Sequence, residues 1–174
     1  MKYNMISTKG AYTSDNILEK RALIYIINKI KNQNKKIGLC VGAFDLLHPG
    51  HVNHFISAKK HCDVLIVGIT TDKFIKRNKN KNRPIYNQQL RAFFVSQLKP
   101  IDFVFLSDYR TANEVINILK PDFYIKGPDY KNDNRKDIVS ERESIKKVGG
   151  RIIYTSDEKL SSTKIIAYIQ KLKN

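Results

Sequence analysis

The sequence has no tryptophan and two cysteines, and none of its apolar runs approaches the roughly 20 residues of a membrane-spanning helix. Cys40 and Cys62 lie in or beside predicted core segments, and their spacing matches no standard zinc site. We therefore expect two buried free thiols and no metal centre built on them. No apolar stretch of the signal-peptide kind follows the first residues, so we expect a cytoplasmic protein that neither enters a membrane nor is secreted.

Acidic residues are scarce: there are 16 of them against 32 lysines and arginines, which gives a formal net charge of +16. Such a surface attracts anions, including nucleic acid, nucleotides and phosphorylated small molecules. A/T-rich coding sequences also produce this excess of Lys, Asn and Ile, so the total charge does not identify a ligand. A nucleic-acid-binding protein is the alternative from another class. We do not expect nucleic acid as the partner, because no binding motif is present and the Tyr and Phe residues fall mostly in predicted core positions.

The chain of 174 residues, 41% of them hydrophobic, is long enough for one domain with its own core. Short apolar runs alternate with amphipathic segments, which predicts the doubly wound, Rossmann-like α/β class: a five-stranded parallel sheet with helices on both faces. We expect a flexible N-terminus over residues 1–14 and a single domain over residues 15–174. The expected strands are 37–41, 64–69, 102–106, 123–126 and 151–154, and the expected helices are 15–31, 50–61, 88–98, 111–120, 138–148 and 162–172.

Residues 71–86 carry many lysines and arginines and are expected to form a polar, basic connection. The apolar face of the last helix is expected to point inward and comprises Ile165, Ile169 and Leu172.

The most informative segment is GAFDLLHPGH at residues 42–51, between an expected strand and an expected helix. His48 and His51 can point into the same space at the helix N-terminus, where backbone N–H groups and the helix dipole favour phosphate. Gly42 lets a ligand approach the backbone, and Gly50 keeps a side chain out of the helix start. Ligands of such sheets bind at the carboxyl ends of the strands. The segment therefore predicts a site for a nucleoside triphosphate.

This segment resembles the GxFDxxHxGH signature of the cytidylyltransferase-like nucleotidyltransferases. Other segments are similar to the heptose 1-phosphate adenylyltransferase branch: VLIVGITTD at 64–72, RPI at 83–85 followed by Arg91, KPD at 120–122, KGPDY at 126–130, GG at 149–150 and SSTKII at 161–166. The resemblance covers residues 15–174. It implies a Rossmann-like enzyme that transfers a nucleotidyl group from a nucleoside triphosphate to a phosphorylated sugar or polyol and releases pyrophosphate. Mg²⁺ would accompany the triphosphate.

The resemblance also implies roles for individual residues. The catalytic residues would be His48, His51 and Lys79, with Lys81 as the alternative to Lys79 at the leaving pyrophosphate. The nucleotide would be bound by Gly42, Ala43, Phe44, Gly50, Lys126, Gly127, Ser161, Ser162 and Thr163. The phosphorylated acceptor would be bound by Asp45, Lys81, Arg91, Asp129 and Tyr130. No set of residues is expected to cage a metal ion, although Asp45 could reach Mg²⁺ through water.

Within this family the resemblance favours ATP and heptose 1-phosphate, for the synthesis of a nucleotide-activated sugar. Pro128 stands where the heptose branch usually has a second glycine, which leaves the acceptor and the base open. Ser156 stands where glycerol-phosphate cytidylyltransferases carry an arginine, which weighs against cytidine. A cytidylyltransferase acting on glycerol 3-phosphate or another polyol phosphate is the alternative. Among partners, a homodimer stays open, and the resemblance suggests a sugar kinase in the same pathway.

Overall fold

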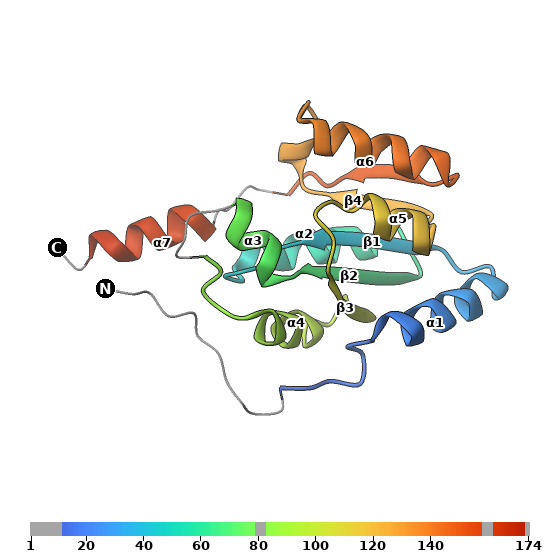
Figure 1. Ribbon diagram of the computed structural model, residues 1–174, viewed down its shortest axis with the longest axis horizontal. Helices are drawn as coiled ribbons and strands as arrows, with labels where there is room; N and C mark the ends of the chain where they lie inside the picture. Colours follow the sequence, from blue (N-terminus) through green and yellow to red (C-terminus); the bar gives the residue numbers. More distant parts are fainter. Residues whose placement is uncertain (1–11, 79–82, 158–161, 173–174) are drawn as a thin grey trace.

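Five parallel strands form one sheet in the computed structural model, which describes residues 12–78, 83–157 and 162–172 (Figure 1). They are β1 (Ile37–Gly42), β2 (Val64–Thr70), β3 (Phe103–Ser107), β4 (Phe123–Lys126) and β5 (Arg151–Tyr154). The strands lie in the order β3-β2-β1-β4-β5, and each neighbouring pair is parallel. The predicted α/β class is therefore confirmed.

Helices cover both faces of the sheet. They are α1 (Lys20–Asn32), α2 (Pro49–Lys59), α3 (Asp72–Asn78), α4 (Gln88–Ser96), α5 (Asn113–Leu119), α6 (Lys136–Lys147) and α7 (Ser162–Lys171), with a short 3-10 helix at Pro128–Tyr130. The core has two halves, one on each face. Helices α1, α5 and α6 pack on one face through residues such as Ile27, Ile116 and Ile145, whereas α2 and α4 pack on the other through Phe55 and Val95.

The position of β1 decides where a ligand can bind. β1 is buried in the centre of the sheet, and its residues alternate between the two halves of the core, with Leu39 in one and Cys40 in the other. From β1 the chain builds outward to β2 and β3 on one side and later to β4 and β5 on the other. The loops after β1 and β4 therefore lead in opposite directions and leave a crevice between the carboxyl ends of these two strands.

The N-terminal segment differs from its prediction. Helix α1 begins at Lys20, and residues 15–19 are not helical. Instead, the Leu18 N–H donates to the Val104 carbonyl at 2.8 Å, and the Val104 N–H donates to the Asn16 carbonyl at 2.8 Å. These two bonds cover the edge of β3, which would otherwise present unpaired backbone groups. The flexible N-terminus predicted over residues 1–14 stays a prediction, because residues 1–11 lie outside the described part of the chain.

Two other helices differ from their predictions. Part of the basic connection is helical, since α3 runs from Asp72 to Asn78 with Phe74 and Ile75 buried. In α7, Ile169 and Leu172 are exposed rather than inward-facing. Figure 1 gives the reason: α7 extends beyond the carboxyl edge of the sheet, away from the two halves of the core.

Both cysteines are free thiols, as the sequence predicted; Cys40 is buried, whereas Cys62 is only partly buried. Among the helices in the described ranges, none combines the length and the apolar character that crossing a membrane requires.

Candidate functional site

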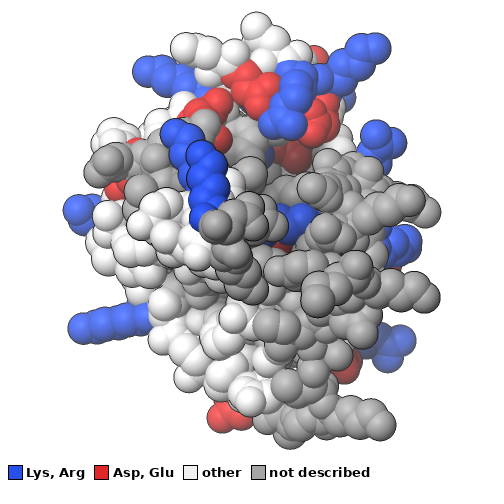
Figure 2. Space-filling view, turned by 90° about the vertical axis from the view of Figure 1, so that its left-hand side faces the viewer, with Lys and Arg blue, Asp and Glu red and all other residues white. Residues whose placement is uncertain are grey.

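A cavity of about 330 Å³ lies at the crevice between β1 and β4. Its walls come from the loop after β1, the first turns of α2, the end of β4 with the 3-10 helix that follows, the segment after β5 and the start of α7. Figure 2 views the side of the molecule on which the strands end, and lysine and arginine side chains are spread over it. A cavity at this switch point is where the fold is expected to hold a ligand.

The two histidines of the 42–51 segment meet in this cavity. Helix α2 begins at Pro49, a residue suited to the first helical position, and His48 precedes it with an extended backbone. The rings of His48 and His51 stack with their centroids 3.8 Å apart and their planes 20° apart. Burial lowers the pKa of His48, which favours the neutral form of its ring. The pair lies at the N-terminus of α2, as predicted.

Phe44 supports this pair from behind. Its φ of 45° is unusual for a residue with a side chain, and it turns the ring toward α2. There the ring packs edge-on against His51 with the centroids 5.4 Å apart, and against Phe55 with the centroids 5.0 Å apart. A methyl group added at Gly42 would lie 2.9 Å from the Phe44 ring. Gly42 is therefore needed for the packing of the loop, in addition to lining the cavity.

Asp45 lines the cavity, but its charge is balanced within the protein. The carboxylate accepts hydrogen bonds from the backbone N–H groups of Ile85 at 2.6 Å and Tyr86 at 3.3 Å. Its other oxygen lies 2.8 Å from the guanidinium of Arg83, and both side chains are buried or nearly so. Asp45 thus ties the end of the basic connection to the loop after β1.

Arg91 does not reach the cavity. Its side chain is fully buried, and its guanidinium donates to the carbonyls of Ala43, Thr70 at 2.8 Å and Tyr86 at 3.1 Å. It also forms an ion pair of 2.7 Å with Asp72. This placement corrects the expectation that Arg91 contacts the acceptor, because its donors already bind groups of the protein. Arg91 instead joins the ends of β1 and β2 to the start of α3.

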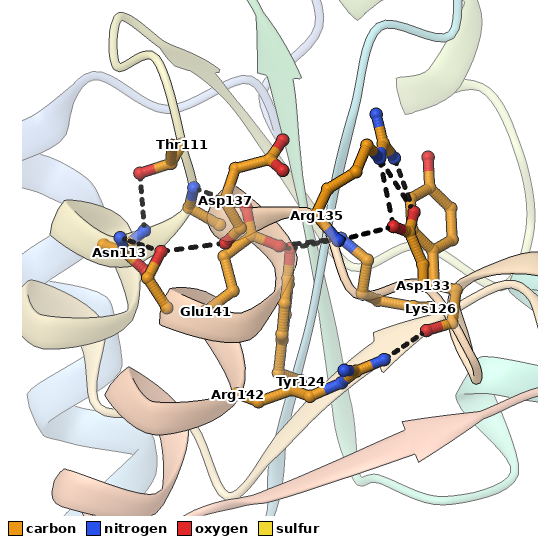
Figure 3. A network of polar contacts seen from close by, with 12 residues as sticks. Thr111, Asn113, Tyr124, Lys126, Asp133, Arg135, Asp137, Glu141 and Arg142 are labelled. Carbon is orange, nitrogen blue, oxygen red and sulfur yellow. Dashed lines mark hydrogen bonds and ion pairs between the residues drawn. The ribbon is translucent and has the colours of Figure 1, made fainter.

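Lys126 lines the cavity, and its ammonium turns to α6. The Nζ atom donates to Glu141 at 2.8 Å and to the Tyr124 hydroxyl at 3.1 Å, and it lies 4.2 Å from the centroid of the Tyr130 ring. Figure 3 shows this network, in which the second Glu141 oxygen accepts the Ala112 N–H at 3.0 Å. The ammonium is therefore committed to the protein.

The turn after β4 is held by α6. Arg142 donates to the backbone carbonyls of Tyr130 at 2.7 Å and Lys131 at 3.0 Å. These bonds fix the 3-10 helix that places Gly127, Asp129 and Tyr130 in the wall of the cavity. The predicted base or acceptor residues of this turn thus share the cavity with the histidines.

The start of α7 closes the site from the far end of the sequence. The Ser162 hydroxyl donates to the carbonyl of Leu46 at 3.1 Å, and Ser162 lines the cavity. Ala43 and Gly50 also line it, and their predicted contact with the nucleotide stays a prediction. Lys79, Lys81 and Ser161 lie outside the described residues, and so does the side chain of Thr163; their roles stay predictions.

Four polar residues of this region were not predicted. His54 and Ser57 follow His51 on α2, and Thr155 and Asp157 follow β5. The interval of three residues from His51 to His54 and then to Ser57 was a usable signal, because such positions lie on neighbouring parts of a helix surface. For Thr155 and Asp157 the sequence offers no local pattern.

The cytidylyltransferase-like family model matches residues 39–168. The bifunctional protein HldE of Aliarcobacter butzleri is 38% identical over 125 residues, which are 71% of this chain and 26% of that protein. HldE of Hyphomonas neptunium is 37% identical over 150 residues, 85% of this chain and 30% of that protein. The chain thus spans about a quarter to a third of the length of these curated relatives.

A solved structure is also similar to this chain. The lipopolysaccharide core biosynthesis protein of Thermoplasma volcanium is similar with a TM-score of 0.60 and 28% identity, over 72% of this chain and 99% of that chain. The HldE relatives support the heptose-phosphate adenylyltransferase branch that the motifs indicated. The region matched by the family model contains every described wall of the cavity, from the end of β1 to the start of α7. We conclude that the chain belongs to the cytidylyltransferase-like family of nucleotidyltransferases.

Proposed function

We propose that the chain transfers the nucleotidyl group of a nucleoside triphosphate, with ATP preferred, to a sugar 1-phosphate such as heptose 1-phosphate. Pyrophosphate leaves, and the product is a nucleotide-activated sugar. The observation that carries this proposal is the stacked His48–His51 pair at the N-terminus of α2, beside Ser162 and at the switch point of the sheet. Helix N-termini and imidazole N–H groups bind phosphate oxygens, and family membership supports nucleotidyl transfer as the reaction.

In this proposal an oxygen of the acceptor phosphate attacks the α-phosphorus in line. A new P–O bond forms to the acceptor as the bond between the α-phosphorus and the bridging oxygen of pyrophosphate breaks. The enzyme needs no covalent intermediate, because positioning and charge neutralisation carry such a step. His48 and His51 donate N–H groups to oxygens of the α- and β-phosphates. Lys79, with Lys81 as the alternative, holds the leaving pyrophosphate.

Mg²⁺ accompanies the triphosphate in this proposal and neutralises part of its charge. Within the described ranges, no three His, Cys, Asp or Glu side chains converge as a metal site. Asp45 is already engaged by Arg83 and two backbone N–H groups. The residues present therefore fit a Mg²⁺ ion that phosphate oxygens and water hold, which is a common arrangement for this ion.

The first test removes the imidazole of His51. We expect His51→Asn to lower pyrophosphate release from ATP and heptose 1-phosphate by roughly 100-fold or more, because one preorganised charge donor is worth about that much. His61→Asn is the matched control, since His61 is exposed just after α2. A loss in His51→Asn of less than about threefold would contradict the proposed role.

The same assay separates the substrates when each nucleoside triphosphate is paired with sugar 1-phosphates and polyol phosphates. A strong preference for CTP and glycerol 3-phosphate would replace the adenylyl version by the cytidylyltransferase alternative. Binding to DNA or RNA that persists at about 200 mM salt, without pyrophosphate release from any triphosphate, would favour the nucleic-acid alternative. A sugar kinase that supplies the phosphorylated acceptor is the proposed partner.

A further inference from the structure

The wall that α2 contributes to the cavity changes its chemistry along the helix. His48 and His51 form the end at the helix N-terminus, and His54 follows three residues later in the same wall. Ser57, three residues further along, does not line the cavity but donates a hydrogen bond to Asp157, which does. Because a helix rises about 1.5 Å per residue, His54 lies about 9 Å along the axis from His48. A nucleotide whose phosphates lie beside His48 and His51 would place its nucleoside beside His54.

His54 does not extend the row of phosphate-binding histidines. Its Nδ1 lies 3.1 Å from the Thr155 hydroxyl and its Nε2 lies 3.5 Å from the sulfur of Cys40, so protein groups occupy both ring nitrogens. Burial lowers the pKa of His54, although the carboxylates of Asp157 and Asp129 oppose this effect. Burial also raises the pKa of Cys40 and keeps it a thiol. His54 is thus a fixed, neutral part of the wall.

Asp157 has one anchored oxygen and one oxygen left over. The Ser57 hydroxyl donates to Oδ1 at 2.7 Å. Oδ2 is buried and has no hydrogen-bond partner among the residues that the structure describes. Asp157 itself lines the cavity. Leaving a buried acceptor unsatisfied costs stability, so such an oxygen in a cavity wall calls for a donor.

The charges around the cavity decide which part of a ligand can supply that donor. Asp45 and Glu141 are neutralised by Arg83 and Lys126, whereas Asp157 takes part in none of the ion pairs found in the described part of the chain. A carboxylate in this position repels phosphate and attracts neutral groups that carry N–H or O–H. Phosphates therefore belong at the histidine end, and a donor-bearing neutral group belongs beside Asp157.

We propose that Asp157 Oδ2 accepts a hydrogen bond from a hydroxyl or amino group of the nucleoside and thereby fixes the direction in which the nucleotide lies along α2. Asp157 determines specificity in this scheme, and Ser57 is a positioning residue that holds the carboxylate. The inference rests on the proposed function, because it takes a nucleoside triphosphate as the occupant of the cavity.

The test is calorimetric titration without the acceptor phosphate, so that no turnover occurs. The ligands are ATP, 2′-deoxy-ATP, 3′-deoxy-ATP and purine riboside triphosphate, which lacks the 6-amino group. We expect wild type to bind one of the three analogues roughly tenfold or more weakly than ATP, as for a lost hydrogen bond to a charged group. Asp157→Asn should bind ATP more weakly than wild type does, by a similar factor, and it should no longer distinguish ATP from that analogue.

Two further variants complete the design. Asp15→Asn is the matched control, because Asp15 is exposed and lies outside the cavity, and it should behave as wild type. Ser57→Ala retains the carboxylate but removes its anchor, so it should show a smaller loss in the same direction. It also keeps the inference testable if Asp157→Asn does not fold, which thermal melting followed by circular dichroism will reveal.

Three outcomes would overturn the inference. Asp157→Asn and Ser57→Ala could both keep the affinity and discrimination of wild type. The loss could occur only in the presence of Mg²⁺, which would assign Asp157 to the metal ion. Wild type could bind no nucleoside triphosphate at all, and this result alone would also remove the proposed function.

Discussion

Gly42 and Phe44 show how single residues shape the wall behind His51. Phe44 adopts a positive φ, and its ring occupies the space that a side chain at position 42 would need. The ring is confined on its other sides by His51 and Phe55. A backbone conformation of this kind persists only when the surroundings fix it, and such positions gather at binding sites.

Gly42→Ala should therefore disturb the histidine pair as well as the fold. The added methyl group displaces the Phe44 ring, and we expect the free energy of unfolding to fall by about 1–3 kcal/mol, as for other overpacked sites. Urea denaturation measures this change. Adding Phe44→Leu should restore part of the lost stability, because the smaller side chain leaves room for the methyl group. An unchanged stability of Gly42→Ala would show that the ring moves freely, contrary to this packing.

At the scale of elements, α6 holds the turn after β4 through buried polar groups. Glu141 links α6 to Lys126 at the end of β4, to the Tyr124 hydroxyl and to the Ala112 N–H that precedes α5 (Figure 3). Both charged side chains of this pair are more than nine-tenths buried. Burying two charges is costly, and the cost is offset only while each keeps its partners.

Removing the charge of Glu141 should therefore be strongly destabilising. We expect Glu141→Gln to lower the free energy of unfolding by about 3 kcal/mol or more, because the ammonium of Lys126 stays buried without a counter-charge. Glu143→Gln on the same helix is the matched control, since Glu143 is exposed and should change stability by less than about 0.5 kcal/mol. Equal midpoints of urea denaturation for the two variants would contradict this account of α6.

At the scale of the whole molecule, positive charge is in excess, and ion pairs leave this excess unchanged because each uses one charge of either sign. The sequence has a formal net charge of +16, and basic side chains are spread over the side on which the cavity lies (Figure 2). Such a field raises the local concentration of anionic ligands. Acidification adds to this positive charge, and the added self-repulsion destabilises the folded protein. Protonation of the buried histidines destabilises it as well.

We expect stability to fall as the pH is lowered from about 7 to about 5. Burial lowers the pKa of His48 and His54 below the usual 6.5, so the unfolded chain binds protons more readily than the folded protein. Their contribution is complete above pH 6.5 and is lost as the pH falls toward the folded-state pKa, by at most about 1.4 kcal/mol per pH unit for each group.

Urea denaturation at several pH values measures this slope. His54→Gln should reduce it, because one of the two groups no longer titrates. Stability that is constant or rises on acidification over this range would show that neither ring is held neutral by burial.

The strands and the histidine site were predictable from the sequence because their signals are local. An apolar run marks each strand, and the ends of β4 and β5 coincide with the predicted ones. The segment around His48 and His51 combines strand end, proline and helix start within ten residues. Local signals failed where tertiary pairing decides: residues 16–18 pair with Val104 instead of continuing α1.

The remaining features depend on contacts across long stretches of sequence. Arginine is usually a surface residue, yet the guanidinium of Arg91 is buried and donates to carbonyls from three segments. Asp157 meets Ser57 across 100 residues, and His54 meets Thr155 across 101. No pattern within a single element reveals such pairs. The hydrogen-bond acceptor Asp157 in the cavity wall could therefore be recognised only in the structure.

The contact between Ser162 and Leu46 has a consequence for how the site comes into being during synthesis. It joins segments 116 residues apart, so the histidine loop leaves the ribosome long before the residue that closes over it. A nascent chain that has not yet emerged beyond β5 carries both histidines but lacks two walls of the cavity. A chain that ends at β5 should therefore bind a nucleotide weakly, because it lacks the residues after β5 and at the start of α7 that line the cavity.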